Sequence, residues 1–222
     1  MNFLPLRVAA MTVAILTGLL GPGPAKGADQ AEAMKTAIAH LDEVVQKLLS
    51  DPNLGTIVAG FKQMYAGSPL LLAIRLQRVD VASELLAAGA NVKEPLNEEL
   101  PLTAAVINCG QEMVSLLLDS GADPNQLAAP DDFPALFHSV LMQKLELTKL
   151  LISRGAKVKQ AGPNGRTPLH VVGAMTDDEA TAKFLIEKGA DPLAKDKEGK
   201  TAFDLAVAAK HDKVAKVLQP QK

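Results

Sequence analysis

Residues 155–190 read GAKVKQAGPNGRTPLHVVGAMTDDEATAKFLIEKGA, and this stretch decides the fold. A Gly-Ala pair stands at each end, and the apolar run 184–186 precedes the second pair. Glycine directly after an amphipathic run suits the left-handed residue that ends many helices, because it has no Cβ to clash. Thr167-Pro168 suits a helix start, since the hydroxyl accepts a hydrogen bond from an unpaired backbone N–H and proline has no N–H to leave unpaired. The stretch therefore predicts a pair of helices.

The same pattern recurs along the chain. Gly-Ala pairs follow one another at intervals of 32, 34 and 34 residues, beginning at Gly89, Gly121, Gly155 and Gly189. Related helix starts stand upstream, at Ser68-Pro69, Leu100-Pro101 and the weaker Thr201-Ala202. A fixed period near 33 residues is typical of a solenoid built from repeated helix pairs. We predict five repeats, at residues 68–93, 94–127, 128–161, 162–195 and 196–222.

Thr167-Pro168-Leu169-His170 carries the full signature of the ankyrin repeat, and the chain resembles that family from Ser68 to about Leu218. The resemblance implies an all-α ankyrin-repeat solenoid that binds proteins through its concave face and the turns between repeats. It also implies a structural role for His170, as an imidazole hydrogen-bonded at the helix start. Repeat three departs from the signature, because Pro134-Ala135-Leu136-Phe137-His138-Ser139 matches it well only at Leu136 and Ser139.

Residues 28–67 are predicted to be helical but lack the signature. Asp29 and Glu32 suggest a capping box, and one apolar seam follows it, formed by Met34, Ile38, Leu41, Val45 and Leu48. A second helix has its apolar face at Leu54, Ile57, Val58, Phe61, Met64 and Tyr65. Since the first repeat of a solenoid needs a cover, we interpret the segment as an N-terminal helical cap. The alternative is a partner-binding or dimerising helix.

Residues 1–27 are predicted to be a signal peptide. Arg7 precedes an uncharged, largely apolar run of 13 residues at 8–20, which is short for a membrane span of about 20 residues. Ala25 and Gly27 then suit cleavage before Ala28. With one cysteine in the chain, this predicts a periplasmic protein without stable membrane insertion after cleavage. An uncleaved anchor is the alternative.

Composition argues against a nucleic-acid partner. The chain has 23 basic and 25 acidic residues, and removal of Arg7 and Lys26 with the signal leaves 21 against 25, a formal charge of −4. Aromatic residues are scarce, with no Trp, one Tyr and six Phe. Nucleic-acid binding normally requires a basic surface, often with aromatic stacking platforms.

No motif in the sequence predicts catalysis. The four histidines are not paired at the spacing of metal ligands, so we expect His40 and His211 to be solvated. His138 is predicted on the inner helix of repeat three, near Phe133 and Phe137. Nucleophile elbows, phosphate-binding loops and zinc-protease motifs are missing from the sequence. We expect a protein that is not an enzyme and holds no metal or cofactor.

Two acidic pairs, Asp131-Asp132 and Asp177-Asp178, have no glycine-punctuated ligand loop, and we interpret them as solvated turns. Cys109 lies between the two helices of repeat two, where we expect a buried, inert thiol. If it were exposed, the chain would instead act as a redox or stress accessory through Cys109.

The predicted function is binding of a protein partner by a monomeric module, acting as an inhibitor, an immunity-type protein or an accessory factor. A host-directed effector that leaves the cell is a further alternative. Some of the predicted turns are acidic and one is basic, so charged turn residues are candidates for partner binding. Residues of the inner helices are further candidates. The candidate binding residues are acidic Glu94, Glu98, Glu99, Asp131 and Asp132, basic Lys157, Lys159 and Arg166, and the inner-helix residues His138, Leu141 and Met175.

Overall fold

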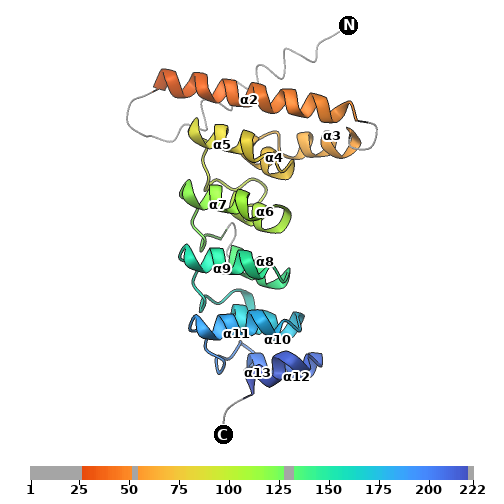
Figure 1. Ribbon diagram of the computed structural model, residues 1–222, viewed down its shortest axis with the longest axis vertical. Helices are drawn as coiled ribbons and strands as arrows, with labels where there is room; N and C mark the ends of the chain where they lie inside the picture. The colour runs from red at the N-terminus through yellow and green to blue at the C-terminus, as the bar shows by residue number, and fades with distance from the viewer. Residues whose placement is uncertain (1–26, 52–54, 128–132, 220–222) are drawn as a thin grey trace.

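A computed structural model describes residues 27–51, 55–127 and 133–219 of the chain (Figure 1). All regular structure in these residues is helical, which confirms the predicted all-α class. The first two helices are α2 (Gly27–Leu49) and α3 (Gly55–Met64). Five helix pairs then follow in the predicted repeats: α4 (Pro69–Arg75) and α5 (Val79–Ala87), α6 (Pro101–Asn108) and α7 (Gln111–Asp119), α8 (Ala135–Leu141) and α9 (Leu145–Ser153), α10 (Pro168–Met175) and α11 (Glu179–Glu187), α12 (Ala202–Ala209) and α13 (Asp212–Leu218).

The helices form two parallel columns (Figure 1). The first helix of each repeat packs on the first helix of the next, so that α4, α6, α8, α10 and α12 make one column, whose members we call the inner helices. The second helices, α5, α7, α9, α11 and α13, make the other column, and we call them the outer helices. Each repeat thus contacts mainly its neighbours, as in other solenoids.

Glycines end the first four outer helices, as the sequence predicts. Gly89, Gly121, Gly155 and Gly189 all have φ between +91° and +94°. Side chains resist this left-handed conformation because Cβ would clash with the backbone. The chain can therefore turn at each of these points into the connection that leads to the next repeat.

One leucine in each of these outer helices anchors the core. Leu85, Leu117, Leu151 and Leu185 are all fully buried. Burial of a leucine side chain stabilises a fold by about 1.5 to 3 kcal/mol. The same position is thus buried in each of these four repeats.

The N-terminal helices cover the first repeat. Met34, Leu41 and Val45 of the predicted seam are buried, and α2 packs mainly on the outer helix α5 while α3 packs on the inner helix α4. The order is the reverse of a repeat, in which the first helix joins the inner column. The apolar seam of α2 is thus covered within the chain, at the end of the stack where a cap is expected.

Details of the predicted cap differ from the structure. Asp29 lies inside the first turn of α2, so it is not the capping residue that the sequence suggested. Met64, the last residue of α3, is 58% exposed, although the sequence placed it on the apolar face and the next residue, Tyr65, is buried. Leu54 lies outside the described residues, and so does the side chain of Ile57. Within the described part of the chain, none of the helices has the length and apolar character needed to cross a membrane.

Candidate protein-binding site between repeats three and four

A pocket of about 160 Å³ opens between the inner helices of repeats three and four. Its lining is almost entirely apolar, although one guanidinium and one imidazole take part. The lining residues are Phe133, Phe137, His138, Leu141, Arg166, Val171, Ala174 and Met175. We call this the aromatic pocket.

Two phenylalanines form its wall on the side of repeat three. The ring centroids of Phe133 and Phe137 lie 5.2 Å apart, a normal distance for a packed aromatic pair. Both rings lie against Gly162 in the next turn, where a Cβ atom would come within 2.9 Å of Phe133 Cδ1 and 3.2 Å of Phe137 Cε1. Because Gly162 has no side chain, the rings can approach the backbone of that turn.

The aromatic residue Phe137 in repeat three replaces a hydrogen-bonded histidine that repeat four has at the same position. Phe137 occupies the register position that His170 holds in repeat four. His170 is buried, and its Nδ1 lies 3.2 Å from the amide nitrogen of Thr167 and 2.8 Å from that residue's Oγ1. Its Nε2 lies 3.1 Å from the carbonyl oxygen of Lys200, which assigns the proton to Nε2. The structural role that the family resemblance implied for His170 is confirmed.

Arg166 connects the pocket to the following turn. Its Nε donates to Asp196 Oδ2 at 3.4 Å, and an Nη atom lies 3.6 Å from Glu198 Oε2. Asp196 is buried and its Oδ1 accepts hydrogen bonds from the amides of Glu198, at 3.0 Å, and Lys200, at 2.9 Å. Burial raises the pKa of Asp196, but these amides and Arg166 outweigh it and hold the pKa below its ordinary value.

The pocket gathers several residues that the sequence singled out. His138, Leu141, Arg166 and Met175 all line it, although they come from two repeats. Leu141 and Met175 are 48% and 59% exposed, which is high for large apolar side chains. Sequence reasoning missed Val171 and Ala174 as part of the site. The available signal was the phenylalanine at the histidine position of repeat three.

The three acidic candidates of the first turn differ in their exposure. Glu94 and Glu98 are exposed and remain available to a partner. Glu99 is instead held inside the fold, because it pairs with Arg75 and accepts a hydrogen bond of 2.8 Å from the Tyr65 hydroxyl. Burial and Glu99 together raise the pKa of Tyr65. The Glu99 carboxylate therefore links repeat two to repeat one and the cap, and its role in partner binding stays a prediction.

The other charged turns are also only partly available. Lys157 and Lys159 are exposed, as a binding role requires. Arg166 is half-buried and paired within the fold, so the basic turn presents less charge than its sequence suggests. Asp131 and Asp132 lie outside the described residues.

Several residues predicted to be solvated serve the fold. Asp178 caps α11 by accepting the Thr181 amide at 3.1 Å, and Asp177 accepts the amides of Lys213 and Val214, at 3.1 and 3.2 Å, at the start of α13. The turn is therefore structural, because its carboxylates satisfy helix N-termini that would otherwise lack partners.

Two histidines predicted to be solvated also have partners within the fold. His40 Nδ1 lies 3.0 Å from Glu84 Oε2 and links the cap to α5. His211 Nδ1 lies 2.9 Å from the carbonyl oxygen of Gly173 and links repeats five and four. Each imidazole therefore has its Nδ1 atom engaged within the fold.

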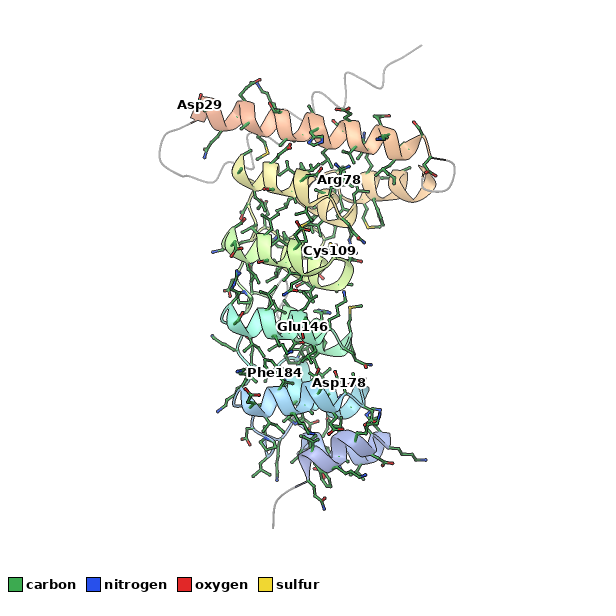
Figure 2. All side chains as sticks on the ribbon, viewed as in Figure 1. Asp29, Arg78, Cys109, Glu146, Asp178 and Phe184 are labelled. Carbon is green, nitrogen blue, oxygen red and sulfur yellow. The ribbon has the colours of Figure 1, made fainter. Side chains whose placement is uncertain are left out.

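Cys109 is buried at the end of α6, as predicted, and Figure 2 shows it within the stack of repeats. Its Sγ donates to the carbonyl oxygen of Ile74 at 3.2 Å. Burial raises the pKa of the thiol, which disfavours the reactive thiolate. The geometry thus favours the inert thiol over the redox alternative. Among the described residues, His, Cys, Asp and Glu side chains form no cluster that could hold a metal ion.

Comparison with known proteins agrees with this architecture. The family model described as "Ankyrin repeats (3 copies)" matches residues 31–128 and 135–222. The chain belongs to the ankyrin-repeat family. The first match begins inside α2, so it includes the helices of the cap.

Relatives of this ankyrin-repeat protein are diverse. A mitochondrial disaggregase from Bos taurus is 33% identical over 145 residues, which cover 62% of this chain and 20% of the relative. Ankyrin repeat and SOCS box protein 6 from Homo sapiens is 30% identical over 151 residues, covering 64% and 36%. A putative ankyrin repeat-containing protein from Treponema pallidum (strain Nichols) is 28% identical over 125 residues, covering 56% and 42%. The matches span less than half the length of each of these relatives, and what they share is the repeat.

Proposed function

We propose that this chain is an exported, periplasmic binding module that recognises a protein partner through the aromatic pocket and the turns beside it. Ankyrin repeats generally mediate protein–protein interaction, which supports a binding role for this chain. The apolar run at 8–20 and the small residues before Ala28 support export. In this setting the module acts as an inhibitor, an immunity-type protein or an accessory factor.

The observation that carries the proposal is the exposed apolar surface of the aromatic pocket. Leu141 and Met175 lie on inner helices of adjacent repeats, and each leaves about half of its side chain uncovered. Covering a large apolar side chain contributes roughly 1.5 to 3 kcal/mol. Protein interfaces draw most of their binding energy from a few such central residues. A partner that covers this pocket therefore gains a binding centre that the folded chain alone leaves open to water.

The direct test is affinity capture from a periplasmic extract of the source organism, with the identified partner then measured as a purified protein. Met175→Glu should weaken that binding at least about tenfold, because it places a charge in the apolar pocket. Met64→Glu is the matched control, since Met64 is equally exposed, at 58% against 59%, but lies on the cap. Equal binding by both variants would contradict the assignment of the site. If residues 1–27 did not direct export of the chain, the proposed periplasmic location would be contradicted.

A further inference from the structure

The size of the aromatic pocket limits what it can hold. Its volume of about 160 Å³ is close to the roughly 150 Å³ of an apolar protein cavity that binds benzene. A single phenylalanine or leucine side chain is of this size, whereas a larger ligand would extend beyond the pocket. Phe133, Phe137 and Met175 supply apolar walls for such a group.

Charge at the mouth of the pocket favours an anion beside that group. Arg166 is the one charged side chain among the lining residues of the described structure. Its contacts with Asp196 and Glu198, at 3.4 and 3.6 Å, are long and involve only part of its five N–H donors. Guanidinium groups pair with carboxylates more strongly than with neutral acceptors.

The turn that contributes Arg166 to the pocket also carries two exposed lysines. Its charged residues are Lys157, Lys159 and Arg166, and it carries no acid. Both lysines are exposed, and neither forms an ion pair with a carboxylate in the part of the chain that the structure describes. The same turn carries Gly162, which contacts the aromatic wall. A segment that lies in the pocket and continues along this turn would therefore meet basic side chains.

We propose that the aromatic pocket binds one phenylalanine or leucine side chain from an extended segment of the partner protein, and that carboxylates flanking this side chain pair with Arg166 and the lysines of the turn. The inference rests on the proposed function, and it names the chemistry of the partner. Apolar contact supplies most of the affinity, while the charges select an acidic segment over a basic or neutral one.

Blocked five-residue peptides test this chemistry on the full chain. The first has phenylalanine at its centre and aspartate on both sides. The second replaces both aspartates with asparagine, and the third replaces the phenylalanine with alanine. Binding is followed by NMR of ¹³C-labelled methionine methyl groups, with Met175 reporting on the pocket and Met64 serving as the distant reference. A Met175→Leu sample assigns the Met175 signal.

The first peptide should shift the Met175 signal in a saturable manner and leave Met64 unchanged. The alanine peptide should bind about 10- to 100-fold more weakly, because it lacks the apolar group. The asparagine peptide should bind about 3- to 10-fold more weakly. In the Arg166→Gln variant, the preference for aspartate over asparagine should fall towards one, while the preference for phenylalanine over alanine remains.

Equal affinity for the three peptides, no saturable shift at Met175, or an aspartate preference that Arg166→Gln leaves unchanged would each overturn the inference. The proposed function fails separately. Loss of the captured partner with Met175→Glu, together with indifference to the peptides, would keep the pocket as a protein-binding site and reject only the acidic, apolar segment.

Discussion

Repeats three and four have the same helix pair and nearly the same length, yet the starts of their inner helices are built differently. Repeat four uses His170, which binds Thr167 on one side and the Lys200 carbonyl on the other. Repeat three has Phe137 in that position, stacked beside Phe133 over Gly162. The polar version closes the junction with directional hydrogen bonds, while the aromatic version leaves an apolar pocket at the surface. The comparison teaches that one departure from a repeat signature changes the chemistry of the junction between two repeats.

The next junction shows how tightly repeat four packs. Gly173 lies on the inner helix α10, and a Cβ there would stand 2.3 Å from the carbonyl oxygen of Ala202. Repeat three tolerates the larger Val140 in the same register, and Val140 is buried. The two junctions therefore differ in the distance between neighbouring inner helices as well as in polarity.

The largest effect is expected from Gly173→Ala. The methyl group collides with backbone, so α12 must shift, and such overpacking costs about 3 kcal/mol of unfolding free energy. Urea denaturation followed by circular dichroism measures the loss. Gly60→Ala is the control, because a Cβ at Gly60 meets nothing within 4 Å and alanine favours a helix. A Gly173→Ala protein as stable as the control would mean that the junction is looser than described.

A smaller loss of unfolding free energy is expected when repeat four receives phenylalanine at the position of His170, as repeat three has at Phe137. His170→Phe removes both imidazole nitrogens, so the Thr167 amide loses its acceptor and the Lys200 carbonyl keeps only the Asp196 amide as a donor, which costs about 1 to 2 kcal/mol. The reverse change, Phe137→His, should also destabilise, because Pro134 stands in the register of Thr167 and offers the imidazole neither an N–H nor a hydroxyl. The same denaturation experiment measures both variants. If either change left the stability unaltered, the two versions would be interchangeable and the comparison would lose its physical basis.

The smallest effect is a difference in acid sensitivity. Asp196 has a lowered pKa in the folded protein, so its carboxylate stabilises the fold at pH values above the unfolded pKa of about 3.9. That contribution is lost as the pH falls through the folded value. The preceding turn has Gly162 in this register and therefore no carboxylate. Asp196→Asn should therefore be less stable than the wild type at pH 7, with the difference shrinking as the pH falls below 4. If the difference in stability between the wild type and Asp196→Asn did not change with pH, the charge of the Asp196 carboxylate would not stabilise the fold.

Much of the fold follows from the sequence because its signals are local. Glycine after an apolar run and proline after a hydroxyl residue act within one turn of helix. The end of α9 before Gly155 and the start of α10 after Thr167 were therefore predictable. The apolar seam of α2 was predictable for the same reason. The exposure of Met64 in α3 was not predictable from the apolar pattern.

The site was less predictable because it depends on contacts between repeats. Sequence alone gave Glu99 and Glu98 the same acidic character, but only the packing of α4 and the cap shows that Glu99 is paired with Arg75. Asp177 similarly caps a helix that begins 35 residues later, at Asp212. His138, Leu141 and Met175 were predicted to lie on inner helices. Their convergence with Arg166 in one pocket required the structure.

The most direct test of the central claim is the hydrogen–deuterium exchange of the chain with and without its captured partner. The account predicts slower exchange in α8, in α10 and in the turn between residues 157 and 166, with α2 and the outer helices α5 and α7 unchanged. Protection confined to α2 or to the outer helices, with α8 and α10 exchanging as in the free chain, would contradict it.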